Sequence, residues 1–365
     1  MKKNVIIFMP SIEDGGVEKN LYEVSNYLVK NNISLEIITC NKNMSFKFSK
    51  DIKFIGTKNS YWNNRSRYIK YIICLLILFL TLIKRKEKTL VFAFQANIYA
   101  VILAKILNVK IITRSNSAPP GWSQNAIKNF IYKFFIKFAN DVMVNSFEFK
   151  KIFEKKFNIK VKCIYNPFNK NFVLKKIKIK KKITFFKKGY LNIISVGRLT
   201  DQKDHLTLLR SIKELDSNFK VKVIIIGKGS TKDILKRYII KNNLQNKIKL
   251  FGYTNNPFPF IQKANMVVLT SKFEGLPNIL LEAQFLRKYI ISTNCPTGPK
   301  EILLNSKAGD LINIGDFKKL SHLIKNYSNN KNSIIKKINS GYNKFYRFDY
   351  MLNCKKYLNF IKNNY

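Results

Sequence analysis

The chain has 365 residues, of which 67 are Lys or Arg and 21 are Asp or Glu, so its formal net charge is +46. Hydrophobic residues make up 46% of it, including 29 Phe and 18 Tyr, which excludes intrinsic disorder and predicts about two globular domains. The five cysteines lack the paired spacing of a zinc site or a disulfide framework, so we expect a reducing compartment. The charge predicts an anionic partner, which could be nucleic acid, a membrane surface or a phosphorylated ligand, although heavy use of Lys, Asn and Ile makes genome composition a contributor.

Apolar runs of strand length alternate with amphipathic stretches of helix length from the beginning of the chain. The first strand is predicted at Val5–Met9 and the first helix at Val17–Asn31, with no secretory signal ahead of them. The further strands of this half are predicted at Leu35–Thr39, Leu90–Ala93, Lys110–Thr113 and Asp141–Asn145. Their apolar character throughout is typical of parallel βαβ units, whose sheet is covered on both faces.

Two segments of the first half combine apolar and basic residues. Tyr71–Ile83 is uncharged and flanked by Arg and Lys residues, but it is shorter than the roughly 20 residues that cross a bilayer, so a core helix or an interfacial helix is expected. Asn125–Asp141 is predicted as a basic and aromatic helix, a composition that suits an anionic membrane surface. We favour the alternative in which its aromatic stripe packs on its own sheet.

The alternation stops at Pro167–Lys188. The charge run Lys175–Lys182 offers no face to bury, so we predict a linker or an exposed edge there. Regular order then resumes, with strands at Leu191–Val196, Val221–Ile226, Ile248–Phe251, Met266–Leu269 and Ile290–Ser292, and helices at Leu206–Leu215, Thr231–Asn242 and Pro277–Arg287.

The predicted fold class is α/β, with two Rossmann-like doubly wound parallel-sheet domains facing a central cleft. The expected domains are residues 1–180, residues 181–345 and a C-terminal helix at 346–365, for which a return to the first domain is open. Open parallel sheets bind ligands at the carboxyl ends of their strands, so candidate site residues are sought in the loops that follow predicted strands.

A glycine pair, Gly15–Gly16, lies between the first strand and the first helix. Glycines there let the backbone approach a ligand, and the start of the helix offers free N–H groups to an anion. An ordinary tight turn explains the pair equally well. Two further glycine turns, Gly227–Ser230 and Thr297–Glu301, follow later strands and are either ligand contacts or simple turns.

Gly197, Arg198 and Lys203 lie in a predicted strand-to-helix loop. Two cations on such a loop can both turn toward a diphosphate, Arg as a fork and Lys as a point charge. In so basic a chain they could also be solvated surface charges. Their place at a strand end favours binding. The two histidines, His205 and His322, lie in no context that suggests a base or a metal ligand.

The stretch Glu274–Ala283 reads EGLPNILLEA and follows a predicted strand. Pro277 suits the first position of a helix, and Gly275 permits a close backbone approach. Glu282 falls in a helix that is otherwise apolar, where a carboxylate needs partners. Sugar or ribose hydroxyls would satisfy it, and so would an internal Arg or Lys.

Together these elements resemble the retaining family-4 glycosyltransferases, the group 1 transferases with the two-Rossmann GT-B architecture. The resemblance covers nearly the whole chain, and the spacing of Glu274 and Glu282 around the EGLPNILLEA stretch is the signature of that family. It implies transfer of a sugar from a nucleoside diphosphate donor to an acceptor hydroxyl, with retention of the anomeric configuration. It also implies that no cofactor and no metal are required, which agrees with the absence of an Asp-x-Asp motif from the sequence.

The resemblance assigns roles to individual residues. Arg198, Lys203 and Glu274 would be catalytic, with the two cations neutralising the leaving diphosphate and the glutamate holding the donor sugar. The implied donor-binding residues are Gly16, Gly275, Leu276 and Glu282, the last of them on the ribose. Many relatives carry a histidine after a strand of the first domain, where this chain has Arg114, Ser115 and Asn116. Arg114 or Asn116, with Gly15, would then serve the acceptor side, and the general base stays open.

The Ser292–Leu303 stretch, together with Phe94–Asn97 and Arg114–Asn116, is similar to bacterial transferases that extend polyprenyl-diphosphate-linked or lipopolysaccharide glycans, some of them with N-acetylhexosamine donors. The implied partners are a nucleotide sugar, with UDP expected, a lipid-linked or glycan acceptor, and an anionic membrane surface. The implied location is cytoplasmic, peripheral on the inner face of the plasma membrane.

Alternatives are a GT-B enzyme with a soluble acceptor, a nucleotide-sugar epimerase and an inactive donor-binding regulator. A basic nucleic-acid-binding protein is an alternative of another class, but no nucleic-acid motif is visible.

Overall fold

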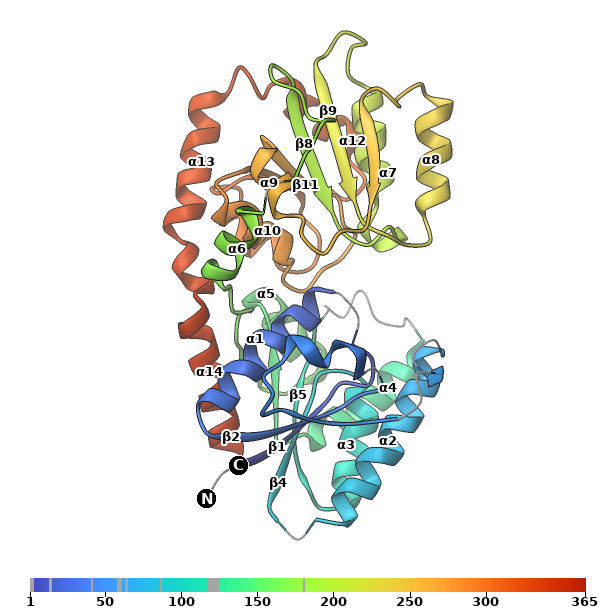
Figure 1. The fold of residues 1–365 in the computed structure, drawn as a ribbon, viewed down its shortest axis with the longest axis vertical. Coiled ribbons are helices and arrows are strands. Elements are labelled where there is room, and N and C mark those ends of the chain that lie inside the picture. The colour runs from blue at the N-terminus through green and yellow to red at the C-terminus, as the bar shows by residue number, and fades with distance from the viewer. Residues whose placement is uncertain are drawn as a thin grey trace. The chain divides into compact units, whose positions relative to one another are not determined.

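The computed structural model describes residues 3–12, 15–40, 42–57, 61–62, 65–85, 87–116, 125–179 and 181–365. Lys180 of the predicted charge run and Ser117 beside Asn116 lie outside these residues. The chain forms two compact units (Figure 1). Unit 1 consists of residues 1–167 and 350–365, and unit 2 consists of residues 168–349.

Unit 1 is built on a sheet whose described strands are all parallel, in the order β3-β2-β1-β4-β5-β6-β7. The strands are β1 (Lys3–Phe8), β2 (Ile33–Ile38), β3 (Lys53–Ile55), β4 (Thr89–Ala93), β5 (Lys110–Arg114), β6 (Asp141–Val144) and β7 (Lys162–Cys163). The order reverses between β1 and β4, which makes this pair the topological switch point of the sheet.

Helices cover both faces of the unit 1 sheet. They are α1 (Gly16–Lys30), η1 (Lys42–Lys47), α2 (Arg67–Ile83), α3 (Asn97–Ile106), α4 (Ala126–Phe135), η4 (Ile136–Phe138), α5 (Phe147–Phe157) and α14 (Tyr350–Asn364). Alternate residues of β1 point to opposite layers: Ile7 packs in a core with α1 and α14, and Ile6 packs in a second core with α2 and α3. Both layers are apolar, which explains why the strands are apolar throughout.

Unit 2 repeats the arrangement, and its described strands are again all parallel, in the order β10-β9-β8-β11-β12-β13. They are β8 (Leu191–Val196), β9 (Val221–Ile226), β10 (Ile248–Gly252), β11 (Met266–Leu269), β12 (Tyr289–Thr293) and β13 (Asp310–Ile312). Here the order reverses between β8 and β11. The two parallel α/β units confirm the predicted fold class.

The helices of unit 2 connect its strands and complete its core. They are α6 (Lys170–Ile177), η5 (Asp201–Lys203), α7 (His205–Lys213), α8 (Lys232–Lys241), α9 (Phe258–Lys263), α10 (Asn278–Phe285), α11 (Pro299–Ile302), α12 (Phe317–Lys325), α13 (Lys331–Asn343) and η6 (Phe345–Phe348). The core under the sheet joins α7, α8, α12 and α13 to β8, β9 and β11.

The predicted linker is partly a helix, which corrects the interpretation of the charge run. Asn169 caps α6 by accepting from the Phe172 N–H (3.0 Å), and Val173 is buried, so the helix has an apolar face ahead of its basic residues. α6 contacts α9, which places residues 168–179 in unit 2 instead of the first domain. At the other end Phe345 packs on Phe168 and Phe285, so the segment belonging to unit 1 begins at Tyr350 and not at residue 346.

The basic, aromatic segment does not pack as we expected. Ile136 is buried and Phe135 is partly buried in a core with α5, but Ile127, Phe130 and Phe134 are exposed. The favoured interpretation, in which the aromatic stripe packs on its own sheet, is therefore wrong for the outer part of α4. The helix has more aromatic residues than one buried face can hold. No helix within the described residues is both long and apolar enough to span a bilayer.

Candidate functional site

The loops after β8 and β11 meet where the strand order of the unit 2 sheet reverses. Gln202 donates from Nε2 to the Phe273 carbonyl oxygen (2.8 Å), and the Lys272 N–H donates to the Gln202 carbonyl oxygen (2.8 Å). These bonds join the two loops at the carboxyl ends of neighbouring parallel strands. Open α/β sheets bind their ligands at such a switch point.

Lys203 and Glu274, one from each loop, form an ion pair. Their side chains are 14% and 9% exposed, so each charge depends on the other for compensation. Behind them Cys295 is buried, and burial, followed by the negative charge of Glu274, raises the pKa of its thiol to about 12. The pair therefore presents one cation and one carboxylate beside a neutral thiol.

Arg198 lies on the same loop as Lys203 but is exposed. Its Nη2 donates to Gln202 Oε1 at 3.4 Å, so the guanidinium joins the network that connects the two loops. Gly227 packs against this loop, because a Cβ there would lie 1.9 Å from the Gly197 carbonyl oxygen. The fixed loop carries Arg198 and Lys203 together, as the sequence predicted.

Gly275 and Leu276 lie in the segment that leads into α10. The loop that follows β12 packs against this segment. The Thr297 hydroxyl donates to the Gly275 carbonyl oxygen (3.0 Å), and the Thr297 N–H donates to that of Glu274 (3.2 Å). Gly298 has φ +94°, and a Cβ there would lie 2.4 Å from the Gly275 carbonyl oxygen. Only glycine combines that backbone conformation with so close an approach.

Glu282 lies on α10, and the structure buries its side chain among the apolar residues of that helix. The helix starts at Asn278, directly after Pro277, close to where the sequence places it. The structure thus brings Lys203, Glu274 and Arg198 into one network, and it places Gly275 and Leu276 beside that network. Glu282 occupies the helix that begins there.

His205 is the residue that the sequence analysis missed. It begins α7 two positions after Lys203, is buried, and its Nδ1 lies 3.3 Å from the Ser195 Oγ. Burial, followed by the charge of Lys203, lowers its pKa to about 4, against a weaker opposing effect of the Gly197 and Arg198 carbonyls. A neutral imidazole therefore lies beneath the Arg198 loop. Its position at a helix start after a basic loop was the available signal.

In unit 1 the glycine pair begins α1, with Gly15 at the N-cap. Both glycines are exposed, but the carboxylate of Glu18 lies beside them, with its Oε2 2.6 Å from the position that a Cβ of Gly15 would take. The favourable end of the helix dipole is therefore already next to an acidic side chain. This loop is less suited to a phosphate than its glycines alone suggest.

Arg114 is enclosed within unit 1, with no exposed surface. Its Nη2 donates to Asn166 Oδ1 (2.8 Å), its guanidinium carbon lies 5.2 Å from the centroid of the Phe94 ring, and its Nε and Nη1 have no hydrogen-bond partner among the described residues. Asn116 is partly exposed and donates from Nδ2 to the Phe94 carbonyl oxygen (2.8 Å). Of these two acceptor-side candidates, Asn116 is the one that reaches the surface.

The described residues contain no cluster of three or more His, Cys, Asp or Glu side chains that could hold a metal ion. The sequence model of the family described as glycosyl transferases group 1 matches residues 176–344. This part of the chain is thus similar to the group 1 glycosyltransferases. This range contains the whole Lys203–Glu274 network.

The chain is 39% identical over 178 residues to the uncharacterized glycosyltransferase MJ1059 of Methanocaldococcus jannaschii, an alignment that covers 47% of this chain and 44% of the relative. The chain thus spans less than half of that relative. It is 25% identical to N-acetylgalactosamine-N,N'-diacetylbacillosaminyl-diphospho-undecaprenol 4-alpha-N-acetylgalactosaminyltransferase of Campylobacter jejuni, over 84% of this chain and 85% of the relative. The crystal structure of Anabaena Alr3699/HepE in complex with UDP matches 99% of this chain and 100% of its own, with a TM-score of 0.79 and 16% identity. This likeness shows the GT-B fold.

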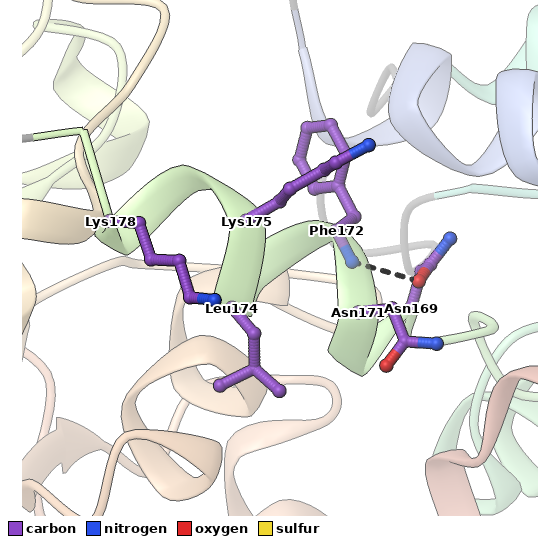
Figure 2. Close-up of a pocket in the computed structure, with 6 residues that line it drawn as sticks. All are labelled: Asn169, Asn171, Phe172, Leu174, Lys175 and Lys178. Carbon is purple, nitrogen blue, oxygen red and sulfur yellow. Dashed lines mark hydrogen bonds between the residues drawn. The ribbon is translucent and has the colours of Figure 1, made fainter.

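A cavity of about 460 Å³ lies along α6, and none of the predicted site residues lines it. Figure 2 shows its lining, which comes from one side of that helix and its cap: Asn169, Asn171, Phe172, Leu174, Lys175 and Lys178. The side chains project from the helix, and the hydrogen bond in the view is the Asn169 cap. The lining has two lysines but no carboxylate, so the network at the switch point remains the candidate site.

Proposed function

We propose that the protein is a retaining glycosyltransferase that moves a hexose or N-acetylhexosamine from a nucleoside diphosphate sugar, with UDP as the nucleotide, to a lipid-linked or lipopolysaccharide glycan. The observation that carries this proposal is the ion pair of Lys203 and Glu274 at the switch point of unit 2. A cation and a carboxylate held together there match a donor that has a diphosphate at one end and a hydroxyl-bearing sugar at the other.

The reaction breaks the bond between the anomeric carbon of the sugar and a diphosphate oxygen. Negative charge then grows on the departing diphosphate, and preorganised cations lower the barrier because they interact most strongly with that charge. Lys203 supplies one cation from a partly buried position, and the exposed Arg198 supplies a second. The acceptor oxygen forms the new bond on the same face of the sugar, and its proton passes to the leaving diphosphate.

The remaining residues hold the donor in this proposal. Glu274 accepts from hydroxyls of the donor sugar while it keeps Lys203 in place, and Gly275 and Leu276 bring the backbone to the donor. Glu282, buried on α10, accepts from the ribose. Gly16, which is exposed, would also bind the donor. On the acceptor side, the exposed Gly15 and the partly exposed Asn116 are the candidates of unit 1 that a ligand can reach.

The acceptor class draws support from relatives of similar length. The Campylobacter jejuni relative is named for transfer to a diphospho-undecaprenol-linked sugar, and its alignment with this chain extends over most of both proteins. A polyprenyl acceptor is confined to a bilayer, so we place the enzyme at the inner face of the plasma membrane. The net charge of +46 would favour attachment to anionic lipids there.

The test is a transfer assay with radiolabelled UDP-N-acetylglucosamine, UDP-N-acetylgalactosamine and UDP-glucose on polyprenyl-diphosphate-linked disaccharides, with the anomer of the product determined by NMR. We expect an α-linked product from an α-linked donor. Arg198→Ala should lower kcat roughly 100-fold with little change in KM, because its partner charge grows in the transition state.

Arg237→Ala is the matched control, because Arg237 is an exposed arginine on α8 of the same unit. It should leave both constants unchanged. Unchanged kinetics of Arg198→Ala, or an inverted anomer, would remove the proposed mechanism. Conversion of the donor to an epimer without transfer would assign the protein to the epimerases.

A further inference from the structure

Helix α2 is apolar on two opposite sides. Its inner side packs on the sheet through Cys74, Leu78 and Leu82, which are buried. Its outer side carries Ile72, Leu76 and Leu80, each more than half exposed. A helix that is apolar all round is normally enclosed by protein, so the outer side of α2 requires a partner.

The apolar surface continues from α2 to α4. Tyr71 of α2 lies 6.4 Å from Tyr99 of α3 between ring centroids, and Lys105 of α3 lies 5.8 Å from the ring centroid of Phe138. Phe134 lies 5.5 Å from Phe138 between ring centroids. α3 contacts both α2 and α4, and the three helices lie side by side along unit 1 (Figure 1).

On α4 and η4 the outward side chains are large. Phe130 is 70% exposed, and Phe134 and Phe138 are each at least 40% exposed. Leu76 on α2 is 57% exposed, so exposed aliphatic and aromatic groups lie on α2 and on α4 with η4, the helices that flank α3. We name these groups the docking face and define it by Ile72, Leu76, Leu80, Phe130, Phe134 and Phe138.

The charges around the docking face are nearly all positive. Between residues 65 and 140 the sequence has thirteen Lys and Arg residues, of which Lys70 and Arg114 are buried, and a single acidic residue, Glu87. Within the described residues of this range the basic side chains include Arg67 at the start of α2, Lys84 at its end and Lys133 on α4. Two copies of this chain packed face to face would therefore bring many like charges together.

We propose that the docking face lies in the boundary between headgroups and acyl chains of an anionic phospholipid bilayer. Apolar side chains enter the boundary, and the surrounding Lys and Arg residues remain with anionic headgroups, as in helices that lie in the membrane plane. The proposal adds a surface to the membrane location in the proposed function, and it does not depend on the donor site of unit 2.

The test is flotation of the full chain with vesicles of phosphatidylcholine alone, or of phosphatidylcholine with phosphatidylglycerol, at a physiological ionic strength of about 0.15 M. We expect binding only to the anionic vesicles. The double variant Leu76→Gln/Phe130→Gln should reduce the fraction bound roughly tenfold or more, because it removes two large groups from the interface. Both residues are exposed, so the variant should fold.

The matched control is Ile234→Gln/Ile240→Gln, which removes two exposed apolar side chains from α8 of unit 2 and should bind like the unchanged protein. Absence of wild-type binding, or equal loss in both double variants, would overturn the proposal. A dimer that becomes a monomer in the docking-face variant would assign this face to a second copy instead.

Thermal stabilisation by UDP and transfer to a water-soluble short-chain acceptor separate this proposal from the proposed function. Both should be unchanged in Leu76→Gln/Phe130→Gln. Loss of vesicle binding with these activities intact supports the docking face. Vesicle binding without any donor binding would instead contradict the transferase mechanism and leave the docking face in place.

Discussion

Unit 1 and unit 2 share the order of their first six strands, to which unit 1 adds β7, but the loops at their switch points present different groups. In unit 2 the loops after β8 and β11 carry Lys203, Glu274 and Arg198, joined by hydrogen bonds. In unit 1 the loop after β1 carries two glycines beside the carboxylate of Glu18. The topology therefore supplies a position for a ligand in both units. The cationic side chains of the unit 2 loops suit an anionic group better than the unit 1 loop does, because the unit 1 loop lies beside a carboxylate.

The two units also differ in how their glycines are held. Gly298 of unit 2 has φ +94°, and a Cβ there would meet the backbone of Gly275. Gly15 of unit 1 has an ordinary φ of −126°, and a Cβ there would meet only the end of the flexible Glu18 side chain. Rigid backbone contacts fix the unit 2 loops before any ligand binds, which is what electrostatic preorganisation requires. The unit 1 loop lacks that constraint at Gly15.

The largest expected effect comes from removing the cation of the buried pair. Lys203→Ala should lower kcat/KM roughly 1000-fold, because it removes transition-state stabilisation, and it should lower the free energy of unfolding by about 3 kcal/mol, because Glu274 is left without its partner. Steady-state kinetics and urea unfolding measure the two effects. Lys272→Ala is the control, since its ion pair with Asp201 is exposed and should contribute under about 1 kcal/mol.

The double variant Lys203→Ala/Glu274→Ala separates catalysis from stability. It removes both charges, so the free energy of unfolding should recover part of what Lys203→Ala loses. Activity should stay low, since no cation has been restored. Recovery of activity together with stability would show that Lys203 only holds Glu274 in place.

A smaller effect is expected from the glycines. Gly298→Ala should lower the free energy of unfolding by about 3 kcal/mol, since alanine disfavours φ +94° and its Cβ would meet the Gly275 carbonyl oxygen. Gly15→Ala should cost under about 1 kcal/mol, because the Glu18 carboxylate can turn away. Urea unfolding of both variants checks the comparison, and equal losses would show that the two loops are held alike.

The sequence was sufficient for the fold and for placing Arg198, Lys203 and Glu274 in loops that follow strands of unit 2, because strand ends and motif spacing are local properties. The ion pair of Lys203 with Glu274 was not predicted. The strands after which Arg198 and Glu274 lie are long and apolar, and parallel order brings their carboxyl ends together. The short strands β3, β7 and β13 were missed, because two or three residues carry no periodic signal. The start of α6 was missed because the basic residues that follow dominate the local composition.

Burial was harder to predict than position. Arg114 was expected on the acceptor side because it lies where many members of the resembled family carry a histidine, but three-dimensional packing encloses it next to Phe94 and Asn166. The outer stripe of α4 was expected to pack inward, yet it is exposed. A periodic stripe shows which residues share a face of a helix, and it does not show whether that face meets protein or solvent.

A further expected effect, smaller than those of Lys203→Ala and Gly298→Ala, concerns pH. It again distinguishes the units, because both histidines of the sequence, His205 and His322, lie in unit 2. The pKa of His205 is about 4 when folded, against about 6.5 in an unfolded chain, so the unfolded state binds the proton first as the pH falls. The contribution of neutral His205 to the free energy of unfolding is fully present above pH about 6.5 and is lost as the pH falls from about 6.5 to about 4. Between pH 7.5 and pH 5 this loss lowers the free energy of unfolding by about 2 kcal/mol. Urea unfolding at these two pH values should show that the free energy of unfolding depends less on pH in His205→Gln than in the unchanged protein. The control His322→Gln, at an exposed histidine, should behave like the unchanged protein. Equal behaviour of the two variants would contradict a buried, neutral imidazole beneath the Arg198 loop.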